Sequence, residues 1–474
     1  MGRVSWANRT SGRLVSQNPT SPQGRDITTH SSFEGKIKMF NIVILVILAS
    51  FVDYQLLLGP RLELLHVPLN LIDIAAIAAI PAVLWPSQQT SKVPPPQASR
   101  FNECWLALFA LWVFAIMIGY SNHNTWYDIC RDLRSPVMLA IAFILTRKYV
   151  RSNKEVKALI LIIVAGGVFG ATLLLLSSLR FAQWTSYLDA RANNASTPAV
   201  LLAVCVLISM AINRTPLLRS TFLTLALTAI AVIGSVLDLS LTSYLLSILV
   251  PATLIASARV QIRRKLLLAF TFCVICIAVA GVAVTADATE LTTTNGRIAI
   301  LLQPLIDLLN PAANYHLEGR QVGWAATIAY LNKWQILIGH GAGTRVFINT
   351  GVTNVDEIIL GEPTYATYLL NMGIVGVLIL LYLQSKFVYV SFMNMQLDCD
   401  SFGAAIALAL FGYGIVTIIH SLFHNNWMSP QISILYGTLM GITDRYGVMV
   451  RWREIQGRSG VPKRNKNGPI RTLS

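Results

Sequence analysis

Charged residues are scarce in this chain, making up only 12% of its 474 residues. Soluble domains carry about 25% charged residues, so the composition excludes an ordinary water-soluble fold. In their place, 54% of the residues are hydrophobic. They gather in apolar runs of roughly the 17–25 residues that cross a bilayer core. We therefore predict an all-α protein, a polytopic integral membrane helical bundle of about 12 transmembrane helices with one large periplasmic loop.

The predicted transmembrane segments follow one another along most of the chain. They cover residues 40–58, 69–85, 104–119, 134–146, 156–177, 197–213, 218–236, 240–257, 266–284, 365–383, 402–420 and 430–448. The fourth of these segments is shorter than the roughly 17 residues that a bilayer-spanning helix needs.

Cysteine is also sparse and gives no sign of a metal or redox centre. Only Cys273 and Cys276, of the six cysteines, lie close together, and their apolar run has no histidine or carboxylate nearby. Zinc and redox motifs need such partners at fixed spacing. The glycine-rich residues 338–343 lack the flanking strands of a nucleotide-binding fingerprint. We expect neither a metal ion nor another cofactor.

No secretory signal peptide is visible, because the first apolar run begins only at Phe40 and has no small-residue cleavage site. We predict that residues 1–38 are a disordered cytoplasmic N-terminal tail. They are rich in Ser and Arg, and no acidic residue precedes Asp26. A transit peptide, or a gene start that belongs at Met39, is the alternative. The membrane domain then covers residues 39–450, with the periplasmic loop over 285–364, and residues 451–474 form a basic cytoplasmic C-terminal tail.

The net charge of +15 is distributed unevenly between the two faces. If the N-terminus is cytoplasmic and the segments alternate, the cytoplasmic side holds 28 of the 37 Lys and Arg residues. This positive-inside bias fixes orientation in bacterial inner membranes. We therefore predict a multi-pass inner-membrane protein with both termini in the cytoplasm. The basic tail favours anionic membrane lipids over nucleic acid as a partner.

Arginine supplies eight of the nine cations that this topology places on the outer face. They are Arg61, Arg131, Arg134, Arg180, Arg191, Arg297, Arg320 and Arg345. A simple explanation is ion pairing, for example of Arg131 or Arg134 with Asp128 or Asp132. The other explanation is a diphosphate group at the outer membrane surface, which the planar guanidinium fork suits. The sequence leaves both open.

The predicted periplasmic loop carries the polar residues that best suit chemistry. A helix over residues 319–333 would place Arg320, Trp324, Thr327 and Leu331 on one side, at the membrane interface or as a lid. Residues 338–343 are too glycine-rich for a helix and allow tight turns beside a ligand. His340 is then either simply exposed or catalytic. Glu362 precedes Pro363 and is either a charge that complements the helix dipole or a general base.

Three sequence blocks occur in a defined order around this loop: residues 318–324, residues 338–343, and residues 373–376. Together they resemble the O-antigen ligase and polymerase superfamily over about residues 296–383. The spacing from Glu362 and Pro363 through nine residues to Gly373 is similar to that of a ligase motif. Two departures stand out. Glu362 replaces the ligase histidine, and Tyr244 follows Ser243 where family members often carry arginine.

The resemblance implies metal-independent glycosyl transfer at the periplasmic face, with an undecaprenyl-diphosphate-linked glycan as both donor and acceptor. Glu362 and Arg320 would be catalytic. The residues that would bind diphosphate or glycan are Arg191, Arg297, Arg345, Trp324 and His340. The implied function is polymerisation of repeat units into O-antigen or exopolysaccharide, with a chain-length regulator and a flippase as further partners. The alternatives are a ligase that transfers glycan to lipid A-core or protein, and a transporter or flippase of lipid-linked oligosaccharide.

Overall fold

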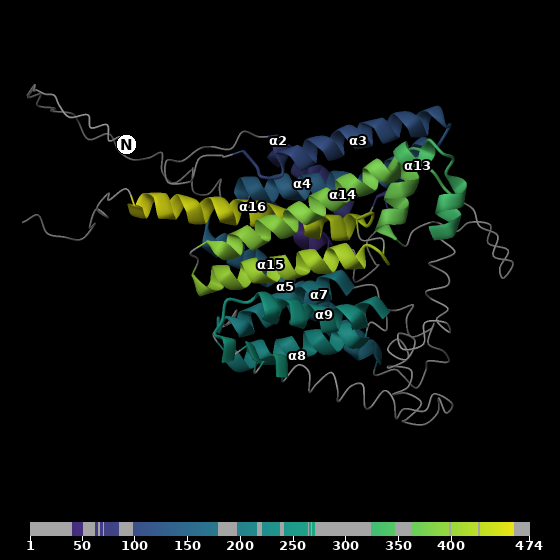
Figure 1. The fold of residues 1–474 in the computed structure, drawn as a ribbon. Coiled ribbons are helices and arrows are strands. Elements are labelled where there is room, and N and C mark those ends of the chain that lie inside the picture. Colours follow the sequence, from purple (N-terminus) through teal and green to yellow (C-terminus); the bar gives the residue numbers. More distant parts are fainter. Residues whose placement is uncertain are drawn as a thin grey trace, which may run out of the picture.

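The computed structural model describes residues 40–50, 62–64, 67–69, 71–84, 98–178, 197–215, 220–237, 241–263, 265–266, 268–270, 324–346, 363–397, 400–424 and 427–458. The predicted apolar runs that fall in these ranges are helical, and consecutive helices run back and forth along a common axis (Figure 1). The main helices are α2 (Leu71–Leu84), α3 (Asn102–Ser121), α4 (Trp126–Tyr149), α5 (Asn153–Ser178), α7 (Thr197–Ile212), α8 (Thr221–Leu237), α9 (Leu241–Ser257), α14 (Thr364–Gln396), α15 (Ser401–His420) and α16 (Pro430–Arg458).

Four helices among the described residues are long and apolar enough to cross a membrane. They are α3, residues Asn153–Leu173 of α5, α14 and α15. Shorter apolar helices occur at Phe40–Ser50, Leu71–Leu84, Pro198–Ile212, Phe222–Ser235 and Ile248–Ser257. A chain with this many apolar helices is a helical membrane protein, as its composition predicts.

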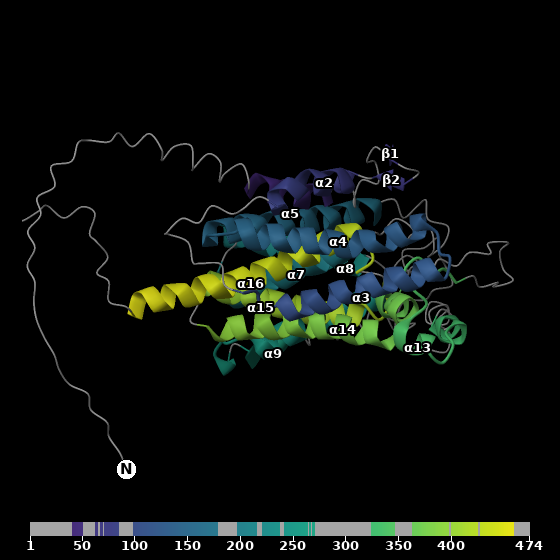
Figure 2. The ribbon, with the colours of Figure 1, turned by 90° about the horizontal axis from the view of Figure 1, so that it is seen from above.

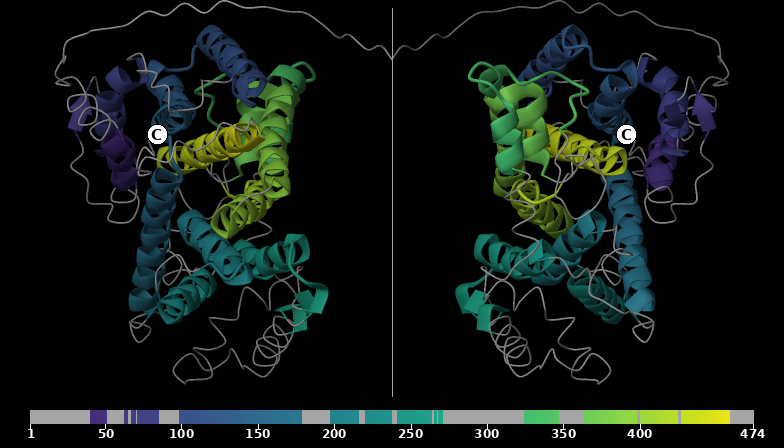
Figure 3. Two further views of the ribbon diagram at one scale, coloured as in Figure 1. Left: turned by 90° about the vertical axis from the view of Figure 1, so that its left-hand side faces the viewer. Right: turned by 90° about the vertical axis from the view of Figure 1, so that its right-hand side faces the viewer.

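The helices form two groups that α5 and α15 join. Viewed from its two ends, the bundle has α2, α3, α4, α14 and α16 on one side and α7, α8 and α9 on the other (Figure 3). Helix α4 packs most extensively against α16, whereas α5 contacts α7 and α8, and α15 contacts both α14 and α7. From above, α16 runs between α4 and α14 and extends past one end of the bundle (Figure 2).

Small residues allow these helices to approach closely, as is common where lipid offers no hydrophobic driving force. An added Cβ at Gly167 of α5 would meet the carbonyl of Ala199 in α7. At Gly437 of α16 it would meet the carbonyl of Leu139 in α4. Gly167 and Gly437 are therefore positions where the absence of a side chain lets two helices pack closely.

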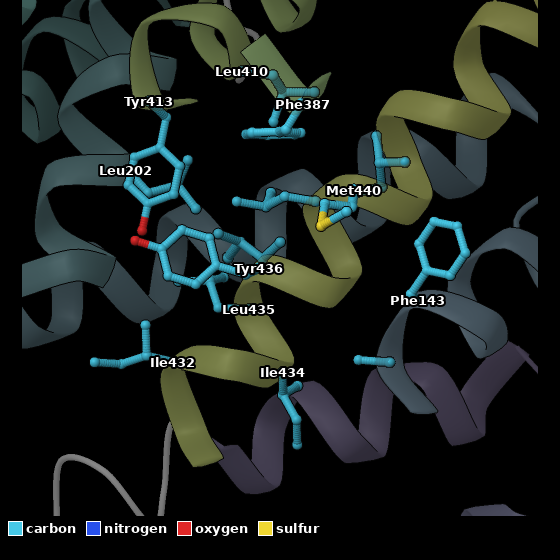
Figure 4. Packing of buried hydrophobic residues seen from close by; sticks show 14 of the residues in the cluster. Phe143, Leu202, Phe387, Leu410, Tyr413, Ile432, Ile434, Leu435, Tyr436 and Met440 are labelled. Carbon is cyan, nitrogen blue, oxygen red and sulfur yellow. The ribbon is translucent and has the colours of Figure 1, made fainter. Parts of the chain in front are cut away.

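The centre of the bundle is aromatic where α7, α15 and α16 meet (Figure 4). Tyr436 of α16 stacks on Tyr413 of α15, with ring centroids 5.7 Å apart, and on Trp427 at 4.8 Å. The buried Tyr413 hydroxyl donates a hydrogen bond to the carbonyl of Pro198 at 3.1 Å. Its polar end is thus satisfied in the apolar core.

Helices α4 and α16 differ in length from the predicted segments. Helix α4 begins at Trp126, eight residues before the predicted start, because the Thr125 side chain caps it by accepting from the Asp128 N–H at 3.2 Å. Helix α16 continues to Arg458, past the predicted start of the basic tail at residue 451; where the membrane domain ends stays a prediction. A polar sequence can extend a helix beyond the membrane. A two-stranded antiparallel hairpin, β1 (Leu62–Leu64) and β2 (Val67–Leu69), is an addition to the predicted all-α architecture.

Candidate functional site

A break in helix α14 is the feature around which one end of the bundle is organised. Gly373 lies inside α14 with φ 66° and ψ −165°, values that interrupt the helical hydrogen-bond ladder. The carbonyls of Leu370 and Asn371, just before the break, accept hydrogen bonds from the N–H groups of His340 (2.7 Å) and Gly341 (3.1 Å). Residues 339–345, the docked loop, therefore replace donors that the break removes.

The glycines of the docked loop are required by its position. Gly339, Gly341 and Gly343 have φ values of 81°, 95° and 82°, which L side chains rarely adopt. An added Cβ at Gly341 would also meet the backbone of Gly119 in α3, and one at Gly339 the backbone around Asn371. The glycine pattern, expected to form tight turns and not a helix, is confirmed here. The close contacts of Gly339 and Gly341 are with the backbone of α14 and of α3.

An ion-pair network fixes the far end of the docked loop to helix α4. Arg345, whose side chain is 14% exposed, donates from Nε to Asp128 Oδ1 (3.1 Å) and from Nη2 to Asp132 Oδ1 (3.0 Å). Asp132 Oδ2 also accepts from the Gly343 N–H (2.9 Å) and from Asn371 Nδ2 (3.0 Å). One carboxylate thus joins α4, the docked loop and the residues before the α14 break.

The turn between α3 and α4 holds the imidazole of His340. Asn122 Nδ2 donates to the His340 carbonyl (2.8 Å) and lies 3.2 Å from His340 Nδ1. When Nδ1 accepts this hydrogen bond, the neutral ring carries its proton on Nε2. The ring is half-buried, and the Tyr330 ring centroid lies 5.2 Å away. His340 is therefore oriented, with one nitrogen available as a donor.

A short amphipathic segment precedes the docked loop and includes Trp324. Residues 324–330 are helical, and α13 (Gln335–Ile338) follows. Thr327 and Leu331 are buried, and Trp324 packs half-buried against the core. This confirms, for the described residues, the one-sided arrangement predicted from the sequence. Trp334 on the same segment is 78% exposed, which suits a side chain at a membrane interface.

The arginines that were predicted to lie on the outer face and that the structure describes are ion-paired. Arg131 Nη2 lies 3.7 Å from Asp128 Oδ1, one of the pairs that the sequence suggested. Arg134 pairs with Asp73 of α2, which is 3% exposed, and not with a residue of its own helix. Ion pairing therefore accounts for these two side chains and for Arg345 without an external anion.

The predicted site residues are only partly brought together. The structure places His340 and Arg345 in the docked loop and Trp324 on the segment before it. Glu362, Arg320, Arg191 and Arg297 lie outside the described residues. As a diphosphate ligand, Arg345 would have to leave or share the two carboxylates that it already contacts, so that role stays a prediction.

Sequence reasoning missed a second polar group, beside the first turn of α14. His420 and His424 stack with ring centroids 4.3 Å apart, and the His424 carbonyl accepts from the Thr364 N–H (3.1 Å) and hydroxyl (2.8 Å). The Tyr365 hydroxyl donates a hydrogen bond to Gln384 Oε1 at 2.6 Å. Both side chains are buried, where a polar group without a hydrogen-bond partner is costly. The spacing of the two histidines by four residues at the end of α15 was the available signal.

No metal centre is evident in the part of the chain that the structure describes, where His, Cys, Asp and Glu form no group of three suited to an ion. Comparison with protein-family models and with curated proteins gave no match to this chain.

Proposed function

We propose that this protein is a membrane glycosyltransferase that polymerises undecaprenyl-diphosphate-linked repeat units at the outer face of a bacterial inner membrane. The proposal includes twelve spans with both termini in the cytoplasm and α13 on the outer side. The alternating helices and the one-sided clusters of Lys and Arg support this orientation.

One observation carries the proposal. Residues 338–343 and residues 373–376, two of the three blocks that resemble the O-antigen ligase and polymerase superfamily, form a single unit through the docked loop and the α14 break. Glycine patterns recur by chance in sequences. These two patterns pack against each other, however, and each allows the close backbone approach of the other. The third block, residues 318–324, comes just before the helical residues 324–330 and α13, and α13 leads into the docked loop.

In the proposed reaction, a hydroxyl of the acceptor glycan attacks the anomeric carbon of the donor glycan. The new bond joins that oxygen to the anomeric carbon, and the bond to the diphosphate oxygen breaks. Undecaprenyl diphosphate leaves with its negative charge stabilised by arginine, for which Arg320, Arg191 and Arg297 are the candidates. Glu362 takes the proton of the attacking hydroxyl as general base. Trp324 and His340 contact glycan.

The start of α14 is well suited to hold such a base. Glu362 directly precedes Pro363, and the next residue, Thr364, is bound through its N–H and hydroxyl to the His424 carbonyl. Two hydrogen bonds fix the backbone next to the proposed base, and a fixed first turn favours a defined position for a preceding side chain. The stacked His420 and His424 lie beside this turn.

The test compares Glu362→Gln with Glu103→Gln, which removes a 73% exposed carboxylate at the first turn of α3. Both proteins should reach the membrane in wild-type amounts. We expect Glu362→Gln to abolish polymer on a gel of extracted glycans, leaving single repeat units, while Glu103→Gln makes wild-type polymer. A general base contributes typically about 10²–10⁴-fold to a rate, so the loss should be unambiguous.

Other outcomes separate the alternatives. Wild-type polymer from Glu362→Gln would overturn the assignment of the base. In a deletion strain, accumulation of lipid-linked polymer would indicate a ligase, whereas repeat units trapped on the cytoplasmic side would indicate a flippase.

A further inference from the structure

The backbone of His340 is bound on both sides, at the end of the bundle where α13 lies near the end of α3 (Figure 1). Its N–H donates to the Leu370 carbonyl of α14 at 2.7 Å, and its carbonyl accepts from Asn122 Nδ2 at 2.8 Å. Asn122 directly follows α3. The imidazole therefore starts from a fixed backbone, and its protonation pattern depends on what the ring itself contacts.

The side-chain amide of Asn122 decides which imidazole nitrogen carries the proton. A backbone carbonyl only accepts hydrogen bonds, so the group that Asn122 turns toward the His340 carbonyl is its NH₂. The same nitrogen lies 3.2 Å from His340 Nδ1. Its second hydrogen can be donated to Nδ1 only when Nδ1 has no proton of its own. The neutral ring then carries its proton on Nε2.

The hydroxyl of Thr344 does not reverse this assignment. Thr344 Oγ1 lies 2.8 Å from the Gly341 carbonyl, to which it donates, and 3.5 Å from His340 Nδ1. A hydroxyl has a single hydrogen, so none is left for the ring. At 3.5 Å its oxygen is also too far away to accept a good hydrogen bond from Nδ1.

The other edge of the imidazole faces away from these contacts. Among the described residues, the hydrogen bonds of the His340 side chain all involve Nδ1, and the ring is half-buried. The Tyr330 ring centroid lies 5.2 Å away, and the Tyr330 side chain is 41% exposed. A fixed donor beside an exposed aromatic face suits a sugar, whose C–H groups are apolar and whose oxygens accept hydrogen bonds.

We propose that His340 donates a hydrogen bond from Nε2 to an oxygen of the glycan, and that Asn122 is the positioning residue that keeps the proton on this nitrogen. The inference rests on the proposed glycosyl transfer and adds to it a residue that does not itself touch the substrate. Because the donor is oriented before the glycan binds, little conformational freedom is lost on binding. An acceptor in place of the Asn122 NH₂ would move the proton to Nδ1 and turn a lone pair toward the glycan.

The first readout is the tautomer of His340 in the full chain purified in detergent. It is read from the imidazole ¹⁵N chemical shifts in alkaline buffer, where the ring is neutral, and His340→Gln identifies the signals by their loss. The variant is Asn122→Asp, whose carboxylate only accepts. The matched control is Asn124→Ala. Asn124 Nδ2 binds the Ala342 carbonyl (2.8 Å) and Thr344 Oγ1 (3.0 Å) from the same turn, without contacting the imidazole.

We expect the proton on Nε2 in wild type and in Asn124→Ala, and on Nδ1 in Asn122→Asp. The second readout is polymer per folded protein on a gel of extracted glycans. It should fall about tenfold or more in Asn122→Asp, since a glycan oxygen would lose its donor and face a lone pair. Asn124→Ala should stay close to wild type, although it weakens the attachment of the docked loop.

Two substitutions of the ring itself separate a hydrogen-bond donor from a proton carrier. The NH₂ of glutamine reaches the place of Nε2, whereas that of the shorter asparagine reaches only the place of Nδ1. His340→Gln should therefore retain more polymer than His340→Asn. Equal and complete loss in both variants would contradict a role as a donor.

A wild-type proton on Nδ1, or an unmoved proton in Asn122→Asp, would overturn the role of Asn122 whatever the polymer shows. Wild-type polymer from Asn122→Asp with a moved proton would overturn the glycan contact of His340 and leave the proposed function standing. Wild-type polymer from a strain that lacks the whole protein would overturn the proposed function, and the glycan contact with it. If Asn122→Asp does not give folded protein, Asn122→Ala replaces it, with a mixture of the two tautomers as the expected result.

Discussion

Replacing Asp132 by asparagine should destabilise the protein more than any other single change of charge in the docked-loop network. The Asp132 side chain is only 6% exposed and accepts from Gly343 N (2.9 Å), Asn371 Nδ2 (3.0 Å) and Arg345 Nη2 (3.0 Å). An asparagine has the same shape but presents an NH₂ group to one of these donors. It also removes the negative charge from beside the Arg345 guanidinium.

The size of the effect follows from burial. Removing one partner of a buried ion pair costs about 3–5 kcal/mol, and leaving a buried donor unsatisfied costs about 1–3 kcal/mol. Arg345 keeps a second carboxylate, Asp128, at 3.1 Å, so the lower part of that range applies. We expect Asp132→Asn to cost about 3 kcal/mol and to lower the midpoint of thermal unfolding of this 474-residue chain by about 3 °C.

The matched control is Asp128→Asn, one helical turn away on α4. Asp128 is 21% exposed and also accepts from the Thr125 hydroxyl at 2.7 Å, so solvent can replace much of what it provides. Its loss should cost about 1 kcal/mol or less. Thermal unfolding of both variants in the same detergent, followed by circular dichroism, makes the comparison. An effect of Asp128→Asn equal to or larger than that of Asp132→Asn would refute the view that Asp132 holds the three segments together.

Two further substitutions test the packing at this end of the bundle. Gly341→Ala should destabilise by about 1–3 kcal/mol, since its φ of 95° disfavours any side chain. At Gly412, which lies inside helix α15 and where a Cβ would press only on the Leu254 side chain and not on backbone, alanine should cost less in the same melting assay. Arg134→Gln should cost up to about 3 kcal/mol because it removes the ion pair between Arg134 and the buried Asp73. Arg131→Gln, at a more exposed pair 3.7 Å long, should shift the melting midpoint little; equal shifts would contradict the assigned partners.

The membrane character and the positions of most helices could be predicted from the sequence because both depend on local composition. A run of apolar residues long enough for the bilayer forms a helix wherever it stands, since only a helix satisfies its backbone there. Local composition also explains residues 338–343, where three glycines within five residues disfavour a helix. The start of α4 was harder to predict, since its first turns are charged and a hydropathy reading assigned them to the loop.

The partners of the charged residues could not be predicted in the same way. The sequence suggested that Arg134 pairs within α4, but the packing of α2 against α4 brings Asp73 closer. Arg345 is more than 200 residues from Asp128 and Asp132 along the chain. Nothing local links positions so far apart. Similarly, the sequence did not show that His424 binds Thr364, because this contact exists only where the end of α15 lies beside the first turn of α14.

By itself, then, the sequence determined the membrane character of this protein and the glycine-rich interruption at residues 338–343, because composition acts residue by residue. The tertiary structure alone decided that the glycines of the docked loop meet the break at Gly373 and that Asp132 joins three segments. The physical reason is that buried polar groups need partners, and the packing of helices distant in sequence determines which partners are within reach.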